Sequence, residues 1–509
     1  MRDLLLPASL LVALVSASPV SPPQPDQVVL EEPHPEITPT AVRRDATRTY
    51  NRPRDILSDL NSDIHGILTA LGSDVPTYVA SGILPFFQEF PTGGAVVSSL
   101  GLNDQELAAV PTQALNFPPY ANYTDQGWNV RFHGNIYKQP NTSEEKLNDL
   151  ANKFLIGTSI SQLPADQAAM ARNVTAEIFI VQQGNVNVSP IAVGPFNNGP
   201  GMSQNVTLPS ETTDEGDYDV FLPINSNGLM RGNETQQIQK LSTHVTNTTE
   251  GNGTAYLVPD QGLTVVSDID DILRVTKIYD PKEGLLNSFA RPYTVWENMD
   301  QIYANWSNSL PNAHFHYLTT LPEQVTRSYE SFIYATYPAG SFDTRPLNFS
   351  DVSATLSIRL FLLEKIFHTF PQRKFVLVAD TSNSDVMRDY PQLAHDYPDQ
   401  VQCIFLRNTS ATDSEDKFPY NTDGFKGLNQ TKYMFFVHAN DLMGINIAGD
   451  TCYNTSIPQN VTFGYQGLPG GQDTAVNSSA NHTGGVSTLT VSNGMTFFAF
   501  ISMLFWQLL

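Results

Sequence analysis

The stretch Leu263-Thr264-Val265-Val266-Ser267-Asp268-Ile269-Asp270-Asp271 joins a run rich in β-branched apolar residues directly to a group of carboxylates. Such a run is typical of a buried strand in a parallel sheet, whose carboxyl end would then present the acidic side chains. Ligands and catalytic groups of open α/β sheets gather at that end. The pattern therefore indicates a phosphate-handling site, although a single D-x-D on its own is better explained by an acidic loop after an ordinary strand.

The bulk composition limits the class of protein and of partner. A chain of 509 residues has room for two or three domains. Acidic residues outnumber basic ones 51 to 28, which gives a formal charge of -23. Because nucleic-acid binding depends on Lys and Arg that neutralise phosphates, this balance argues against a nucleic-acid partner and fits a soluble surface protein.

Both ends of the sequence carry targeting patterns. Residues 1–17 have the apolar run and small-residue cleavage site of a secretory signal peptide. Residues 18–50 are rich in Pro, Glu and Thr and are expected to be disordered, with Arg43-Arg44 as either a processing site or part of a solvated linker. Residues 466–509 form a Ser/Thr/Asn/Gly-rich linker followed by an apolar tail, which indicates a GPI-attachment signal; an ordinary buried helix is the alternative. We therefore expect a chain of the secretory pathway that is held at the membrane of the cell surface by a GPI anchor, or is extracellular.

Glycosylation motifs and cysteines agree with that route. N-x-S/T without Pro occurs at many positions, namely Asn122, Asn141, Asn173, Asn187, Asn205, Asn233, Asn247, Asn252, Asn305, Asn348, Asn408, Asn429, Asn454, Asn460, Asn477 and Asn481. Cys403 and Cys452 are the two cysteines of the chain. In an oxidising compartment they can form one bridge, and two separate buried thiols are the competing interpretation.

Apolar periodicity divides the rest of the chain. Residues 51–115 form a helical segment, with an amphipathic N-terminal helix running from Asp55 to Leu71. Residues 116–260 alternate apolar and polar side chains in several places, including Val130–Tyr137, Ala176–Val181 and Asp219–Leu222. This alternation of apolar and polar residues predicts an antiparallel β-sandwich-like domain.

Residues 261–465 alternate strand and helix patterns. Apolar runs predict strands at Leu263–Val266, Phe315–Leu318, Phe375–Ala379, Gln402–Leu406 and Tyr433–Val437. Helical patterns lie at Met299–Leu310, Pro322–Tyr334 and Thr355–Phe370. Such alternation predicts an α/β fold, a Rossmann-like parallel sheet with helices on both faces.

Polar groups recur at the ends of three of these strands. Asp268 and Asp270 follow the first, Thr319 the second, and Asp380 with Asp385 the third, while Arg359 lies on the preceding helix. Phosphoryl transfer to a carboxylate needs such a set. One Asp attacks phosphorus, a second handles the proton, outer acids hold Mg²⁺, and a hydroxyl and a cation contact the phosphate oxygens.

Several segments resemble the haloacid-dehalogenase-type catalytic domain of the fungal actin-patch-associated phosphatidate phosphatase family. They are Asp268-Ile269-Asp270-Asp271-Ile272 with Val275-Thr276, Asn287-Ser288-Phe289-Ala290-Arg291-Pro292-Tyr293, Phe315-His316-Tyr317-Leu318-Thr319 and Phe370 to Asp380. The resemblance covers about 200 residues, and a preceding β-domain is also typical of the family. It implies Asp268 as nucleophile, Asp270 as acid/base, Thr319 as the phosphate-contacting hydroxyl and Arg359 as the basic residue. It also implies Mg²⁺ as cofactor, with Asp380 and Asp385 as ligands beside the inner carboxylates Asp268 and Asp270.

Three positions depart from the family pattern. Ile272 stands where Thr is usual, Arg359 where Lys is usual, with Lys365 as the fallback cation, and Ala379 where Gly is usual. The chain is therefore expected to be a Mg²⁺-dependent phosphatase of the phosphatidate-phosphatase type, acting on a phosphomonoester that could be a phospholipid. The alternative is a non-catalytic GPI-anchored glycoprotein of the cell surface or wall that keeps the fold as a binding scaffold. His314 and His316 share one face of a strand, where a packed pair is commoner than a metal site.

Overall fold

A computed structural model describes residues 90–345, 352–413, 422–449 and 452–459. The predicted signal peptide (1–17), the segment 18–50, the helix from Asp55 to Leu71 and the segment 466–509 lie outside the described residues. Within the described ranges, no helix combines the length and the hydropathy needed to cross a bilayer.

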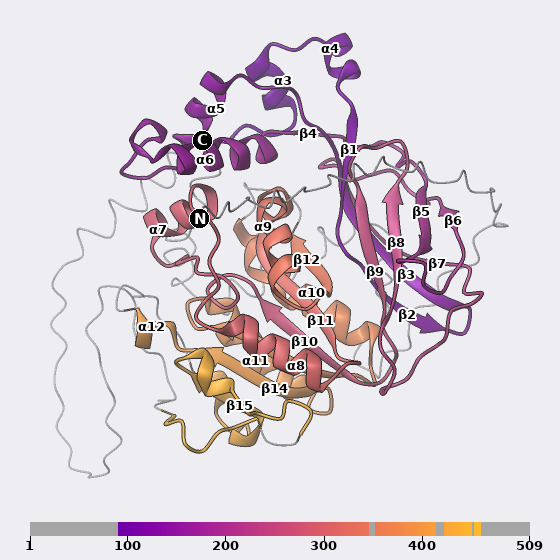
Figure 1. Cartoon of the computed structure of the whole chain (residues 1–509), viewed down its shortest axis with the longest axis vertical. Coiled ribbons are helices and arrows are strands. Elements are labelled where there is room, and N and C mark those ends of the chain that lie inside the picture. Colours follow the sequence, from indigo (N-terminus) through magenta and orange to yellow (C-terminus); the bar gives the residue numbers. More distant parts are fainter. Residues whose placement is uncertain (1–89, 346–351, 414–421, 450–451, 460–509) are drawn as a thin grey trace, which may run out of the picture. The chain divides into compact units, whose positions relative to one another are not determined.

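One sheet consists of six parallel strands in the order β12-β11-β10-β13-β14-β15 (Figure 1). Their bounds are β10 Leu263–Asp268, β11 His314–Pro322, β12 Ser341–Arg345, β13 Lys374–Asp380, β14 Val401–Arg407 and β15 Tyr433–Phe436. The predicted parallel sheet is confirmed, and β12 is a strand that the apolar pattern did not predict. In the register of β10, Asp268 pairs with Leu318 of β11 and Ser267 with Val378 of β13. This alignment brings the carboxyl ends of three strands to one edge.

Helices cover both faces of this sheet, as predicted. They are α7 Pro281–Phe289, α8 Met299–Ser309, α9 Glu323–Thr336, α10 Val352–Thr369 and α11 Ser384–Asp396, followed by the short α12 Thr409–Thr412 and the 3₁₀ turns η4 Asp423–Phe425, η5 Gln430–Lys432 and η6 Ala439–Leu442. Successive residues of β13 enter different cores: Val376 and Val378 pack in the core that contains α8, and Phe375 and Leu377 in the core that contains α10 and α11. Burial on both sides explains why these strands are apolar throughout.

A second sheet contains nine strands within the described residues. They are β1 Thr112–Asn116, β2 Tyr120–Thr124, β3 Gly127–Lys138, β4 Val181–Gln182, β5 Ile191–Pro195, β6 Gln204–Val206, β7 Asp217–Pro223, β8 Gln239–Val245 and β9 Asn252–Leu257. The pairs are antiparallel except β2 with β9, which is parallel. The expected sandwich of antiparallel sheets is therefore one mixed, hydrogen-bonded sheet. The long strand β3 holds this sheet together. On one side its first half pairs with β2 and its second half with β1, and on the other side it pairs with β7.

Helices interrupt the region that was expected to be all β. Ahead of β1 lie α3 Gly94–Leu100 and α4 Asp104–Ala109, and between β3 and β4 lie α5 Glu144–Ala151, η3 Ile160–Gln162 and α6 Ala165–Ile178. The strand predicted at Ala176–Val181 is wrong, since α6 continues to Ile178. Val174 and Ile178 of α6 pack in the same core as Val265 of β10. The helix packs against α5 and η3, its neighbours in sequence, and also against α7 and α9 of the parallel-sheet part. Its stability therefore combines local and distant contacts.

A buried ion-pair network joins the two sheets. Arg131 of β3 donates to Asp219 of β7 (Nε–Oδ1, 2.8 Å) and to Asp343 of β12 (Nη1–Oδ2, 2.6 Å). Lys365 of α10 contacts Asp219 from the other side (2.6 Å). Although burial alone would raise the pKa of Asp343, Arg131 holds it well below its usual range. Ionised carboxylates at this depth are tolerated only while their cation partners stay in place.

Cys403 and Cys452 form a disulfide with a Cα–Cα distance of 5.4 Å. The predicted bridge is confirmed, and the alternative of two separate thiols is wrong. It ties β14 to the segment that follows η6.

Replacement Asp343→Ala should lower the free energy of unfolding by about 3–5 kcal/mol, because it leaves Arg131 buried without one of its carboxylates. Urea unfolding measures the change. The matched control is Asp260→Ala, whose partner Arg231 is mostly exposed, and it should cost no more than about 1 kcal/mol. Equal effects of the two replacements would contradict the structural role of the network.

Reduction of the Cys403–Cys452 bond should lower the free energy of unfolding by roughly 4 kcal/mol, because the bond closes a long loop between cysteines that are 49 positions apart in the sequence. Urea unfolding with and without dithiothreitol measures it. A Cys403→Ala, Cys452→Ala double variant serves as control and should not respond to the reductant. A wild-type protein that is equally stable in both conditions would disprove the expectation.

Candidate active site

Asp268 lies at the carboxyl end of β10 with 1% of its surface exposed. Its Oδ1 accepts the backbone N–H of Ile269 (2.9 Å), and its Oδ2 forms an ion pair with Arg359 Nη2 (3.0 Å). Burial raises the pKa of Asp268 to about 7; Arg359 opposes the rise, and the charges of Asp270 and Asp385 add to it. The strand thus presents a carboxylate whose ionised form depends on a neighbouring cation.

Arg359 of α10 bridges two of the predicted carboxylates. Besides its contact with Asp268, its Nε donates to Asp385 Oδ2 (2.8 Å) in the first turn of α11. Burial by itself would lower the pKa of Arg359, but Asp268 and Asp385 hold it well above the usual value. Its Nη1 is buried and makes no hydrogen bond within the described residues. One guanidinium N–H is therefore left to meet another acceptor.

Asp270 is held by a different set of donors. Its Oδ1 accepts from Arg274 (Nη2, 2.8 Å) and from the hydroxyl of Thr276 (2.8 Å), and its Oδ2 accepts from Thr319 Oγ1 (3.3 Å). Thr319, on β11, is almost fully buried. The structure therefore brings together the predicted acid/base and the predicted hydroxyl, and it fixes the orientation of the carboxyl group.

Asp380 ends β13 and is fully buried. Its Oδ1 accepts from the Ser382 backbone N–H (2.7 Å) and hydroxyl, and its Oδ2 from the side-chain amide of Asn383 (3.1 Å). The same Asn383 Nδ2 lies 3.4 Å from Asp268 Oδ2. One amide therefore spans both carboxylates. Burial, followed by the charges of Asp271 and Asp268, raises the pKa of Asp380 well above its usual range.

Asp271 lies at the same edge of the sheet and stabilises the backbone there. Its backbone φ of 56° is left-handed, and its carboxylate accepts three backbone N–H groups, those of Thr276, Lys277 and Ile278. Arg407, at the end of β14, approaches its Oδ1 to 3.9 Å. These contacts close the loop after β10 into a fixed turn.

Five carboxylates and three arginines thus meet at this edge, which leaves a formal charge of -2 if all are ionised. The acids are Asp268, Asp270, Asp271, Asp380 and Asp385, and the bases are Arg274, Arg359 and Arg407. Oxygen ligands with excess negative charge suit Mg²⁺. In the part of the chain that the structure describes, however, no three His, Cys, Asp or Glu side chains are grouped so that they could hold a metal ion. Arg359 occupies oxygens of two of the predicted ligands, so cation binding would compete with it.

The structure also places the departures from the family pattern. Ile272 is fully buried in the core beneath the site, and Ala379 is buried in the core on the other face of the sheet. Lys365, the fallback cation, contacts Asp219 in the network between the sheets, whereas Arg359 reaches Asp268.

The two strand histidines form a packed pair. Both His314 and His316 share the hydroxyl of Ser341, at 2.8 and 2.7 Å. A packed pair is the commoner outcome that we expected for two histidines on one face of a strand.

Sequence reasoning missed three site residues, namely Arg274, Asn383 and Arg407. Arg274 lies four residues after Asp270, a spacing that alone could have suggested a contact. Asn383 stands at the N-cap position of α11 yet makes no cap hydrogen bond, because its amide faces the carboxylates. No local pattern marks Arg407, whose role follows from strand pairing between β13 and β14.

Comparisons with known proteins identify this part of the chain. Residues 263–408 match the family model described as phosphatidate phosphatase APP1, catalytic domain. Over 167 residues the chain is 25% identical to the phosphatidate phosphatase APP1 of Saccharomyces cerevisiae (strain ATCC 204508 / S288c), an alignment that covers 32% of this chain and 28% of that protein. The chain therefore spans little more than a quarter of the length of this curated relative. All six predicted site residues fall within the matched range, and the family match and the relative support the APP1-like family that the sequence resemblance predicted.

Proposed function

We propose that the parallel-sheet part is a haloacid-dehalogenase-type, Mg²⁺-dependent phosphatase that hydrolyses a phosphomonoester through an aspartyl-phosphate on Asp268. Phosphatidate is the first candidate substrate, because the matched family and relative carry that name. The observation that carries the proposal is the meeting of Asp268, Asp380 and Asp385 around Arg359 and Asn383, beside Asp270.

In the proposed reaction an Asp268 oxygen attacks phosphorus, and the bond from phosphorus to the alcohol oxygen breaks. Asp270 gives a proton to the departing oxygen and later takes one from the water that hydrolyses the acyl-phosphate. Thr319 and Nη1 of Arg359 would donate to phosphate oxygens, where charge develops; Thr319 would then turn its hydroxyl away from Asp270, and the lack of a hydrogen-bond acceptor at Nη1 among the described residues supports the role of Arg359.

Mg²⁺ would neutralise the phosphate and the crowded acids. Asp268, Asp380 and Asp385 would be its protein ligands only if Arg359 released the oxygens of Asp268 and Asp385 that it occupies in this structure. The side chain of Asp270 is the least available of the four predicted ligands, since Arg274, Thr276 and Thr319 already engage its oxygens.

We also propose that the chain matures in the secretory pathway and reaches the cell surface or the exterior, where a GPI anchor would hold it at the membrane. The disulfide supports an oxidising compartment. The acceptor residues Asn141, Asn173 and Asn233 are exposed, as glycosylation requires, whereas Asn122 is buried in β2 and unsuitable.

A second candidate function is the non-catalytic scaffold. The observation that favours it is the pairing of Arg359 with Asp268 and Asp385, which satisfies both acids without a metal. A Mg²⁺ titration followed by calorimetry separates the two candidates. Binding that strengthens in the presence of phosphate supports the enzyme, and lack of binding supports the scaffold.

Replacement Asp268→Asn should lower Mg²⁺-dependent phosphate release from phosphatidate by at least about a thousandfold, because the amide cannot attack phosphorus. A colorimetric phosphate assay measures the rate, with a generic phosphomonoester as second substrate. The control Asp399→Asn changes an exposed carboxylate in the turn before β14 and should leave the rate unchanged. Retention of full activity in Asp268→Asn would rule out the mechanism.

Replacement Asn383→Ala should reduce kcat/KM by about 10–100-fold and raise the Mg²⁺ concentration needed for half-maximal activity, because it removes the amide that orients Asp268 and Asp380. Rates are measured across a Mg²⁺ series. Replacement Asn383→Gln, which keeps the amide, should recover part of the loss. A rate and Mg²⁺ requirement equal to wild type would show that the amide does not position these acids.

A further inference from the structure

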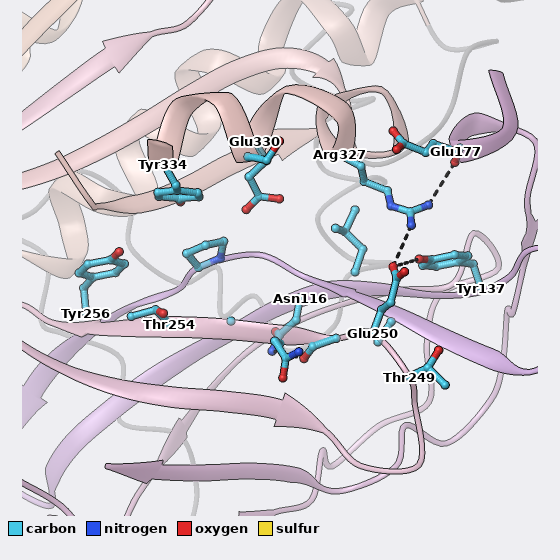
Figure 2. A pocket seen from close by; sticks show the side chains of 17 residues that line it. Asn116, Tyr137, Glu177, Thr249, Glu250, Thr254, Tyr256, Arg327, Glu330 and Tyr334 are labelled. Carbon is cyan, nitrogen blue, oxygen red and sulfur yellow. Dashed lines mark hydrogen bonds and ion pairs between the residues drawn. The ribbon is translucent and has the colours of Figure 1, made fainter. Parts of the chain in front are cut away.

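A polar cavity of about 580 Å³ lies between the mixed sheet and α9 (Figure 2). Its lining comes from β1, the segment 249–251, β9 and α9, together with Pro118, Tyr137 of β3 and Glu177 of α6. It includes none of the residues assigned to phosphate chemistry. This volume is within the range of small-molecule sites. The cavity is therefore a candidate site of its own, and an inference about it goes beyond the proposed hydrolysis.

One end of the cavity is organised around Arg327. Its guanidinium lies 3.2 Å from Glu250 Oε2, donates to the main-chain oxygen of Glu177 (3.2 Å), and covers the ring of Tyr137 at 4.6 Å. Glu177 Oε2, by contrast, is buried and has no hydrogen-bond partner among the described residues. The arginine is thus engaged by one acid and does not satisfy the second.

Glu330 occupies another part of the cavity. Its carboxylate points into open space near Tyr334 and makes no hydrogen bond within the described ranges (Figure 2). Burial raises the pKa of Glu330 to about 7, and Arg327 opposes the rise. The tyrosines Tyr256 and Tyr334 are close enough that the negative charge of Glu330 raises their pKa values, in addition to burial.

We propose that this cavity binds a small organic ammonium ion, with Glu330 as counter-charge and the rings of Tyr256 and Tyr334 as neighbours. Three carboxylates and one arginine line the cavity, which gives it a formal charge of -2 if all are ionised, so it repels anions and attracts cations. An ammonium group near tyrosine rings gains both ion-pair and cation–π attraction. A second ammonium group would meet the unpaired Glu177, so a short diamine fits better than a monoamine.

Other ligand classes fit the lining less well. A neutral polyol would leave the charges of Glu330 and Glu177 without a counter-ion, and a lipid chain would have to lie beside the charged groups of Glu177, Glu330 and Arg327. A metal ion fits less well, because Arg327 already engages Glu250 and lies among the carboxylates that would have to serve as ligands.

Titration calorimetry of the purified full chain with 1,4-diaminobutane tests the proposal, and 1,4-butanediol is the neutral analogue of equal length. The diamine should bind and the diol should not. Replacement Glu330→Gln should weaken diamine binding by about tenfold or more. It replaces the carboxylate with an amide of nearly the same size, so folding should be retained, and thermal unfolding checks this.

Two further variants complete the design. Glu177→Gln, on a separate helix, should also weaken binding, whereas Glu234→Gln, in an exposed loop, should not. No binding of the diamine at millimolar concentration, equal binding of the diol, or unchanged affinity in Glu330→Gln would each overturn the proposal.

Discussion

Burial of several carboxylates at one edge of a parallel sheet is the constraint on which this structure depends. Each buried ion costs several kcal/mol unless a partner compensates it, and the partners here come from distant segments. Arg274 follows β10, Arg359 lies on α10 and Arg407 ends β14. The acids therefore become tolerable only when strand, helix and loop are all in place. Folding of the parallel sheet and assembly of the candidate site are, for this reason, one process.

The compensation of buried negative charge is incomplete at Asp380, and this bears on function. Asp380 is fully buried, and its hydrogen-bond donors among the described residues are hydroxyl and amide groups. A scaffold without a ligand would gain stability from an apolar residue at such a position. A carboxyl group kept in a buried and charge-crowded place is instead typical of sites where a cation or a reacting group completes the balance. The arrangement thus favours the enzyme over the scaffold.

The sequence predicts the parallel sheet well because its signal is local. Five of the six strands are buried on both faces and contain apolar runs, and the acids of the site stand at the ends of β10 and β13. The missed strand β12 has the sequence Ser-Phe-Asp-Thr-Arg, which is polar because Asp343 serves the network with Arg131. The prediction for the segment Ala176–Val181 fails partly for a similar reason. Besides its neighbours α5 and η3, α6 packs against α7 and α9, and no local period reveals these distant contacts. The spacing of residues in the sequence cannot predict partners from distant segments, such as Arg407 and Asn383.

The departure at Ile272 shows how a motif mismatch can mislead. The family pattern places a hydroxyl there, and its absence suggests a weakened site. In the structure the side chain of Ile272 is fully buried in an apolar core, where a hydroxyl would need its own partner. Hydroxyl contacts to Asp270 come instead from Thr276 and Thr319. The acid/base candidate therefore keeps two hydroxyl donors and an arginine. The mismatch changes packing beneath the site and leaves the donors around Asp270 in place.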